Sequence, residues 1–170
     1  MKRRKKTFLL LLILGLLMGG ILLSIKAHAV WNDTWCKTKL KVIYFSMVFY
    51  FREHKKLPDY QVWYDLLIQE ADVSKDCFIC PTKKQKGNVG TYVINKDFDI
   101  LWNMPPDCVF VFEGVSGWNQ SGGKNEIRPL HHGGCHVLFS NGDIKFIKEK
   151  DFPNLIWKKE EIKDSGISSD

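Results

Sequence analysis

Residues 137–147 read VLFSNGDIKFI, and this stretch decides the fold of the C-terminal half of the chain. Two short apolar runs, Val137–Phe139 and Ile144–Ile147, flank the pair Asn141-Gly142. An Asn-Gly pair between apolar runs is the strongest short-range signal for a two-residue hairpin turn, because both turn positions need positive φ. The stretch therefore predicts a β-hairpin.

The chain upstream of the hairpin has the same strand character from residue 91 onward. Gly, Pro, Asn and Asp separate short runs rich in Val, Ile and aromatic residues, and two of these runs are Thr91–Ile94 and Val109–Phe112. Each run is predicted to form a short strand.

Two helices are predicted before residue 71. Residues 34–54 carry apolar side chains at spacings of three and four, which indicates a helix with one buried stripe. Leu57-Pro58 ends it, because proline disfavours helical geometry in the preceding residue. A shorter helix is predicted from Asp59 or Tyr60 to Glu70. The residues expected to face inward are Leu40, Ile43, Tyr44, Met47, Val48 and Phe51 in the first helix and Val62, Trp63, Leu66 and Leu67 in the second.

Helices followed by strands predict an α+β fold, with an antiparallel sheet laid on the stripe of the first helix. The composition, with 45% hydrophobic and 26% charged residues, is ordinary for a globular domain. We expect one such domain over residues 30–160, a flexible tail over 161–170, and a separate N-terminal segment over 1–29.

The N-terminal segment has the pattern of a membrane anchor. The basic cluster Lys2–Lys6 is followed by Phe8–Ile25, eighteen residues without a charge. Such a run spans about 27 Å as a helix, close to the ~30 Å hydrocarbon core of a bilayer. The basic flank predicts a cytoplasmic N-terminus and a periplasmic C-terminal domain. The triplet Ala27-His28-Ala29 resembles a signal-peptidase site, so a released periplasmic or secreted protein is the alternative.

The charge balance argues against nucleic-acid binding. The formal net charge is +6, but Lys2–Lys6 supply five of the 25 basic residues. Without them, 20 basic residues face 19 acidic ones, a balance of +1. A nucleic-acid-binding domain usually carries a basic stripe on its folded part, so no nucleic-acid partner is expected.

The order of several short motifs resembles the prepilin-like proteins of planctomycetes and their relatives. The match covers roughly residues 36–147, from a Cys-x-x-x-Leu-Lys start through Leu-Pro and Phe-x-Cys-Pro to a C-terminal His-x9-Asp-Gly motif. That motif reads here as His131, Gly133, Gly134, Asn141 and Gly142. The resemblance implies a pilin-like layout, in which an N-terminal hydrophobic helix continues into an amphipathic helix packed on a small antiparallel sheet.

Two departures separate this sequence from the family pattern. Asn141 stands where the family has Asp, so this position keeps a turn residue but lacks a carboxylate. Thr7 and Leu12 stand where prepilins have the Gly that precedes the peptidase cut and the Glu that helps subunits dock. The resemblance therefore implies a type II secretion pseudopilin-like protein more than a processed filament subunit.

Five cysteines lie in a part of the chain expected in an oxidising compartment, where disulfides persist. We predict a staple between Cys36 and Cys80, with Cys77 as the competitor for Cys36. It would close a loop of roughly 45 residues and contribute about 3–4 kcal/mol. Cys108 and Cys135 stay unassigned.

The histidines near Cys135 have the chemistry of zinc ligands, but the sequence does not favour a metal site there. Neighbours on an extended strand point to opposite faces, so at most two of His131, His132, His136 and Cys135 can converge without a distant partner. His131 is instead expected to hydrogen-bond a neighbouring loop, and Gly133-Gly134 to permit close backbone approach. No metal, cofactor or catalytic residue is predicted.

These patterns together favour a non-catalytic pseudopilin-like structural or assembly protein, anchored in the inner membrane with a periplasmic head. Its expected partners are other pilin-like or secretion-system subunits, with homo-oligomers as a further option. The alternative is a released protein- or glycan-binding module. It would use the long loop around Trp118, the residue predicted to contact a partner.

Overall fold

The computed structural model describes residues 2–81, 89–98 and 104–158. The chain divides into two units, Met1–Trp35 and Cys36–Asp170. The boundary lies six residues after the one expected from the sequence. The tail predicted over 161–170 lies outside the described residues.

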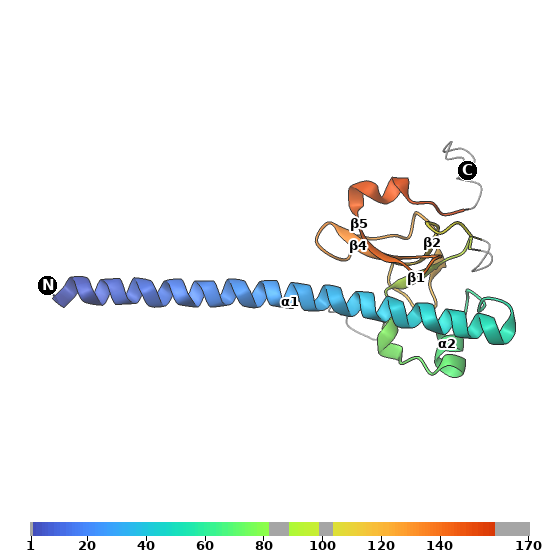
Figure 1. Ribbon diagram of the computed structural model, residues 1–170, viewed down its shortest axis with the longest axis horizontal. Coiled ribbons are helices and arrows are strands. Elements are labelled where there is room, and N and C mark those ends of the chain that lie inside the picture. The colour runs from blue at the N-terminus through green and yellow to red at the C-terminus, as the bar shows by residue number, and fades with distance from the viewer. Residues whose placement is uncertain (1, 82–88, 99–103, 159–170) are drawn as a thin grey trace. The chain divides into compact units, whose positions relative to one another are not determined.

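The helices are α1 (Lys2–His54) and α2 (Trp63–Ala71), with the short 3-10 helices η1 (Lys75–Phe78) and η2 (Glu149–Asn154). The strands are β1 (Tyr92–Asn95), β2 (Val109–Glu113), β3 (Ser121–Gly122), β4 (Gly134–Phe139) and β5 (Ile144–Lys148). Figure 1 labels most of these elements, and in the C-terminal unit the strands and α2 gather around the last turns of α1. The α+β class and the four strands predicted from the sequence are thus confirmed.

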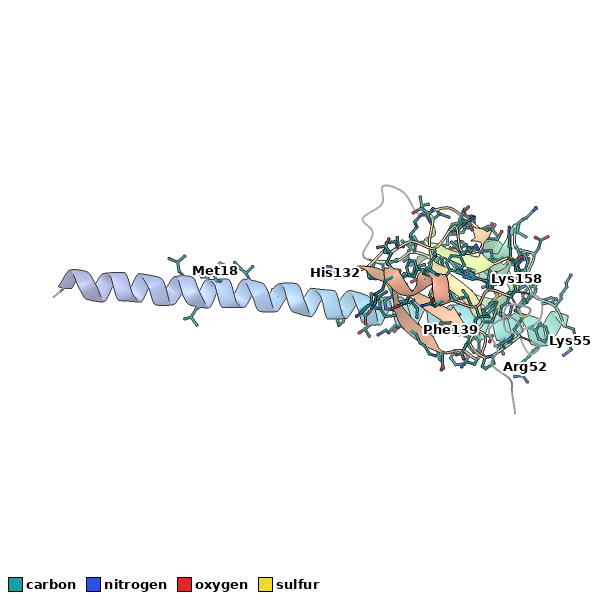
Figure 2. All side chains as sticks on the ribbon, turned by 90° about the horizontal axis from the view of Figure 1, so that it is seen from above. Met18, Arg52, Lys55, His132, Phe139 and Lys158 are labelled. Atoms are coloured by element: carbon teal, nitrogen blue, oxygen red, sulfur yellow. The ribbon has the colours of Figure 1, made fainter. Side chains whose placement is uncertain are left out.

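α1 begins at Lys2 and passes through Thr34, so the amphipathic helix predicted over residues 34–54 is the C-terminal part of one longer helix. It ends at His54, shortly before Leu57-Pro58, and Lys55 follows with a left-handed φ of 58°. Figure 2 shows Arg52 and Lys55 at this C-terminal end.

The sheet has the order β3-β1-β2-β4-β5 and separates two apolar cores. On the face toward α1, residues from the helices and from the near side of the strands share one buried cluster. On the far face, the other strand residues pack against Trp157 and Ile127. The near cluster includes Leu40, Ile43, Met47, Trp63, Tyr92, Ile94, Val111 and Leu138, and the far cluster includes Val93, Val109, Phe112, Cys135, Val137 and Phe139.

The pilin-like layout expected from the sequence is corrected by two findings. The sheet is mixed, because β3 pairs in parallel with β1. The seven-residue connection after β2 takes the chain past β1 to its outer edge, so β3 pairs with β1 instead of forming a hairpin with β2. In addition, within the part of the chain that the structure describes, no helix combines the length and the apolar character needed to cross a membrane.

The hairpin predicted at 137–147 is present, but its turn differs from the expected one. β4 and β5 pair antiparallel, with Leu138 opposite Ile144. Gly142 has a φ of 85°, whereas Asn141 is not among the residues with positive φ. The backbone N–H groups of Gly142 and Phe139 donate to Phe139 and Asp143 respectively, both at 2.9 Å. The connection is therefore a turn closed by one left-handed glycine, instead of a two-residue turn with both positions left-handed.

Candidate functional site

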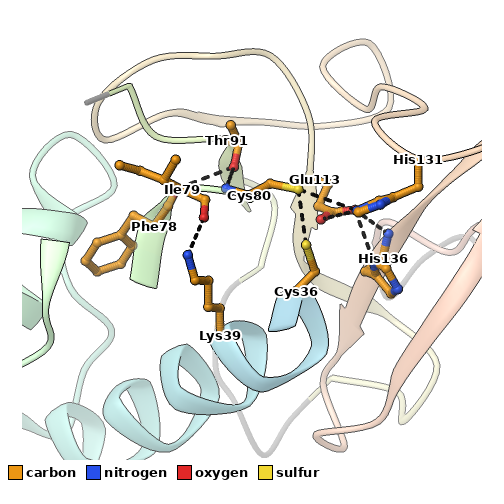
Figure 3. Close-up of polar contacts among 9 residues, drawn as sticks. All are labelled: Cys36, Lys39, Phe78, Ile79, Cys80, Thr91, Glu113, His131 and His136. Carbon is orange, nitrogen blue, oxygen red and sulfur yellow. Dashed lines mark hydrogen bonds and ion pairs between the residues drawn. The ribbon is translucent and has the colours of Figure 1, made fainter. Parts of the chain in front are cut away.

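Four side chains from separate elements of the C-terminal unit meet at the near face of the sheet. Cys36 comes from α1, Cys80 from the segment after η1, Glu113 from the end of β2, and His131 from the loop before β4. One sulfur, nitrogen or oxygen atom from each lies within 4.8 Å of those from all the others. Figure 3 shows the four side chains pointing toward one another. We call this group the Cys-Glu-His cluster.

The two cysteines are held close by the chain around them. Their Sγ atoms lie 3.1 Å apart, as two thiols in hydrogen-bonding contact. Lys39, one helical turn after Cys36, donates from Nζ to the carbonyl oxygens of Asp76 and Ile79, both at 2.6 Å. These bonds fasten the segment before Cys80 to α1.

Cys80 is fixed a second time from the strand side. Its backbone N–H donates to Oγ1 of Thr91 at 2.7 Å, and the N–H of Thr91 donates to the carbonyl of Phe78 at 2.9 Å. Both cysteine side chains are fully buried. The pair predicted from the sequence is therefore brought together, and a disulfide between the two stays a prediction.

Glu113 and His131 form a buried pair. His131 Nε2 lies 2.9 Å from Glu113 Oε1, and their side chains are 8% and 0% exposed. The other carboxylate oxygen, Oε2, accepts the backbone N–H of His136 at 2.7 Å and lies 3.2 Å from His136 Nδ1. Each oxygen of the carboxylate thus has a defined partner, which fixes the orientation of Glu113.

The pKa values of this pair shift in opposite directions. Burial acts to raise the pKa of Glu113, but hydrogen bonds and charge from His131 and His136 outweigh it and lower the pKa to about 2. Burial acts to lower the pKa of His131, but contact with Cys80 and Glu113 outweighs it and raises the pKa to about 10. At neutral pH, the metal-free cluster therefore contains a carboxylate paired with an imidazolium.

The Cys36 thiol does not have the properties of a catalytic nucleophile. The hydrogen bond with Cys80, then burial, then the nearby Glu113 raise the pKa of the Cys36 thiol. A thiol with a raised pKa is protonated and unreactive at neutral pH, whereas nucleophilic cysteines have a lowered one. A structural or ligand-binding role therefore fits Cys36 better than nucleophilic catalysis.

The structure also shows where the unassigned cysteines lie. Cys135 belongs to the far core, on the opposite side of the sheet from the cluster, and burial raises the pKa of its thiol. Cys108 is buried in the near core. Cys77, the predicted competitor for Cys36, is half-buried in η1. Cys80 is therefore the cysteine that the fold places against Cys36.

The side chains of the histidine-rich stretch point to different sides, because neighbouring residues of a strand face opposite sides of the sheet. His131 and His136 converge on Glu113, with ring centroids 4.6 Å apart, while Cys135 points the other way. His132 is exposed (Figure 2). His131 was expected to hydrogen-bond a neighbouring loop, but its Nε2 lies 2.9 Å from Oε1 of Glu113, which is the last residue of strand β2.

The two glycines after His132 have different roles. Gly134 allows close approach, because a Cβ atom there would lie 2.2 Å from the carbonyl oxygen of Ile147. Gly133 has a φ of 74° and nothing within 4 Å of an added Cβ, so it supplies backbone conformation and not space.

Trp118, the predicted partner contact, is half-buried and held by α2. Its Nε1 donates to Asp65 Oδ1 at 2.8 Å, and its ring lies edge-on to Tyr64 at 5.0 Å between centroids. The neighbouring Asn119 accepts the backbone N–H of Tyr64 at 2.7 Å, which caps the first turn of α2. These contacts fasten the loop to α2 of the same domain. Binding of a partner by Trp118 stays a prediction.

Comparison of the chain with protein-family models, with curated proteins and with solved structures gives no match. The fold and the site alone define its class: an α+β domain with a buried cluster of two thiols, one carboxylate and one imidazole. The resemblance to prepilin-like proteins stays a prediction from the sequence.

Proposed function

We propose that this chain is a non-catalytic structural or assembly protein, whose C-terminal unit acts outside the cytoplasm and associates with a second copy through the exposed face of α1. The observation that carries the proposal is a row of large apolar side chains on that face. Val42, Phe45 and Phe49 are 37%, 59% and 50% exposed. They lie on the side of α1 opposite its core residues, such as Ile43 and Met47.

The spacing of these residues suits a helical partner. Positions 42, 45 and 49 are separated by three and four residues, the repeat of a seam between two paired helices. A seam made from one such row is self-complementary in a parallel pair, where each residue meets its own copy. A second copy of this chain therefore fits the row.

Lys41, the basic residue one helical turn before Phe45, is held away from a partner by its own domain. Lys41 Nζ lies 3.2 Å from the carbonyl oxygen of Gly142 and 5.5 Å from the ring centroid of Phe45. The ammonium group is thus turned toward the hairpin of its own domain, which reduces repulsion between two copies.

The placement outside the cytoplasm rests on the sequence. The basic cluster Lys2–Lys6 before the apolar run Phe8–Ile25 is the pattern of an export or anchor segment with a cytoplasmic N-terminus. The same pattern is the support for a single-pass anchor in the inner membrane with a periplasmic head.

Sedimentation equilibrium of the full chain in detergent micelles tests the proposal. The wild type should show a monomer–dimer equilibrium. Phe45→Ser with Phe49→Ser should weaken it by about 100-fold or more, because a dimer loses four half-exposed phenylalanines at roughly 1 kcal/mol of burial each. Val42→Ser should weaken it as well, whereas Val62→Ser, at the similarly exposed valine before α2, should not. A wild type that stays monomeric, or an equal loss in both valine variants, contradicts the proposal.

A further inference from the structure

We propose that Cys36, Cys80, Glu113 and His131 bind a zinc ion. The inference is independent of the proposed function, because it rests on the Cys-Glu-His cluster and not on the exposed face of α1. Two thiolates, one imidazole and one carboxylate are ligands that zinc accepts, and structural zinc sites take four protein ligands in a tetrahedron.

The spacing of the ligand atoms matches such a tetrahedron before the ion enters. Zinc lies about 2.3 Å from sulfur and about 2.0–2.2 Å from nitrogen or oxygen, which places neighbouring ligand atoms roughly 3.3–3.8 Å apart. The sulfur atoms of Cys36 and Cys80 are 3.1 Å apart, Cys80 Sγ is 3.5 Å from His131 Nε2, and Nε2 is 2.9 Å from Glu113 Oε1. All four ligand atoms lie within 4.8 Å of one another, so small adjustments of the side chains would place them around one ion.

Groups around the cluster are placed to support a metal site. His136 donates its backbone N–H to the oxygen of Glu113 that does not face His131, so the carboxylate is oriented by its other oxygen. Such outer hydrogen bonds are typical of metal ligands and fix their geometry. Lys39 and Thr91 anchor the segment that carries Cys80.

Tyr92 supplies a second observation that points to a ligand. Its hydroxyl is fully buried and has no hydrogen-bond partner within the described residues. Tyr92 lies directly opposite Glu113 in the register of β1 and β2, so its side chain faces the cluster. A buried hydroxyl without a partner is costly, and a thiolate on Cys36 would give it an acceptor. Zinc binding produces that thiolate, because the ion replaces the thiol protons.

A disulfide between Cys36 and Cys80 is the competing state, since both states need the same sulfur atoms. The disulfide would use only two of the four converging groups. It would form no bond to Glu113 or His131, whereas zinc uses all four. The two states are distinguished by counting free thiols and by measuring metal binding on the same preparation.

Cobalt titration of the reduced, chelator-treated full chain tests the site, with Co²⁺ as the spectroscopic probe and Zn²⁺ as the competitor. We expect one Co²⁺ per chain, thiolate-to-cobalt charge-transfer absorption, the intense visible bands of a tetrahedral ion, and displacement of Co²⁺ by one equivalent of Zn²⁺. Cys80→Ser and His131→Ala should weaken binding by more than about 100-fold, beyond the effect of losing an outer hydrogen bond.

Matched controls lie next to the ligands in the sequence. Cys77→Ser and His132→Ala change the same residue types without touching the cluster, and both should bind cobalt like the wild type. His131→Cys restores a metal ligand and should regain binding that His131→Ala loses, which a purely structural role would not produce. Near-ultraviolet circular dichroism from the buried aromatic residues shows which variants are folded.

Three outcomes overturn the proposal. The first is a reduced, folded wild type that binds neither metal. The second is binding that Cys77→Ser or His132→Ala abolishes to the same extent as the cluster variants. The third is a Cys36–Cys80 disulfide in every purified preparation, together with no affinity for Zn²⁺ after this disulfide has been reduced.

Discussion

Two histidine–glutamate pairs in this chain differ in burial, and we expect their coupling energies to differ accordingly. His131 Nε2 lies 2.9 Å from Glu113 Oε1, with side chains 8% and 0% exposed. His54 Nε2 lies 2.5 Å from Glu70 Oε2, with side chains 37% and 33% exposed. The distances are both those of direct contact, so burial is the variable that the comparison isolates.

The magnitudes follow from the surroundings of each pair. A hydrogen bond between charged groups shielded from water contributes about 1.5–3 kcal/mol, and we expect a coupling energy of that size for His131 and Glu113. An exposed pair is screened by solvent and typically contributes about 0–1 kcal/mol, which we expect for His54 and Glu70. Removing Glu113 alone should cost more than the coupling energy, about 3–5 kcal/mol, because it leaves a buried charge without its partner.

Two double-mutant cycles measure these energies by urea unfolding of the reduced, metal-free full chain at about pH 6, where the buried pair is charged. One cycle uses Glu113→Gln and His131→Ala, and the other uses Glu70→Gln and His54→Ala. Equal coupling energies in the two cycles, or a buried coupling below about 0.5 kcal/mol, would refute the reasoning that burial strengthens this contact.

Two further predictions concern the same part of the fold. In the metal-free chain, the raised pKa of His131 gives stability that is complete below about pH 6.5 and lost as the pH rises through about 10, while the lowered pKa of Glu113 gives stability that is complete above about pH 4.5 and lost as the pH falls through about 2. The urea midpoint should therefore be highest between about pH 4.5 and 6.5, and His131→Ala should remove the decline on the alkaline side. Gly133→Ala should cost about 1 kcal/mol for its positive φ, whereas Gly134→Ala should cost more, about 1–3 kcal/mol, because its Cβ would lie 2.2 Å from the carbonyl oxygen of Ile147. Urea unfolding measures the loss of stability in each glycine variant. A larger loss for Gly133→Ala than for Gly134→Ala would show that the close contact with Ile147 does not determine the cost at Gly134.

Local sequence patterns predicted the elements of this fold well, because each of them depends on neighbours in the chain. The apolar stripe of α1 and the alternation of β4 and β5 are readable at spacings of two to four residues. The parallel edge strand β3 was not predicted, because its pairing with β1 depends on where a seven-residue loop returns. Two residues, Ser121 and Gly122, carry no strand signal of their own.

The candidate site was predicted only in part, for a related reason. Cys36 and Cys80 were paired as a staple between the post-helical loop and the first helix, and His131 was expected to hydrogen-bond a neighbouring loop. Glu113 was missed, although one signal was present: an acidic residue ends the otherwise apolar strand β2. The contacts of Glu113 with His131 and His136 span 18 and 23 residues, which no local spacing rule covers.

The position of Glu113 within the cluster depends on an irregularity in β2 that the sequence does not announce. In a regular strand, alternation from Val109, which faces the far core, would place residue 113 on the far face as well. The register between β2 and β4 shifts between Val109 and Val111, so that Phe110 and Val111 both face α1. Phe112 then faces the far core, and Glu113 turns toward Cys36.

A bulge of this kind redirects every later side chain in its strand. The cluster therefore needs α1, the segment after η1, the bulged strand β2 and the start of β4 in place at the same time. Since each of the four groups is contributed by a different element, a ligand held by all four stabilises the packing of the whole C-terminal unit, and loss of that packing abolishes the site.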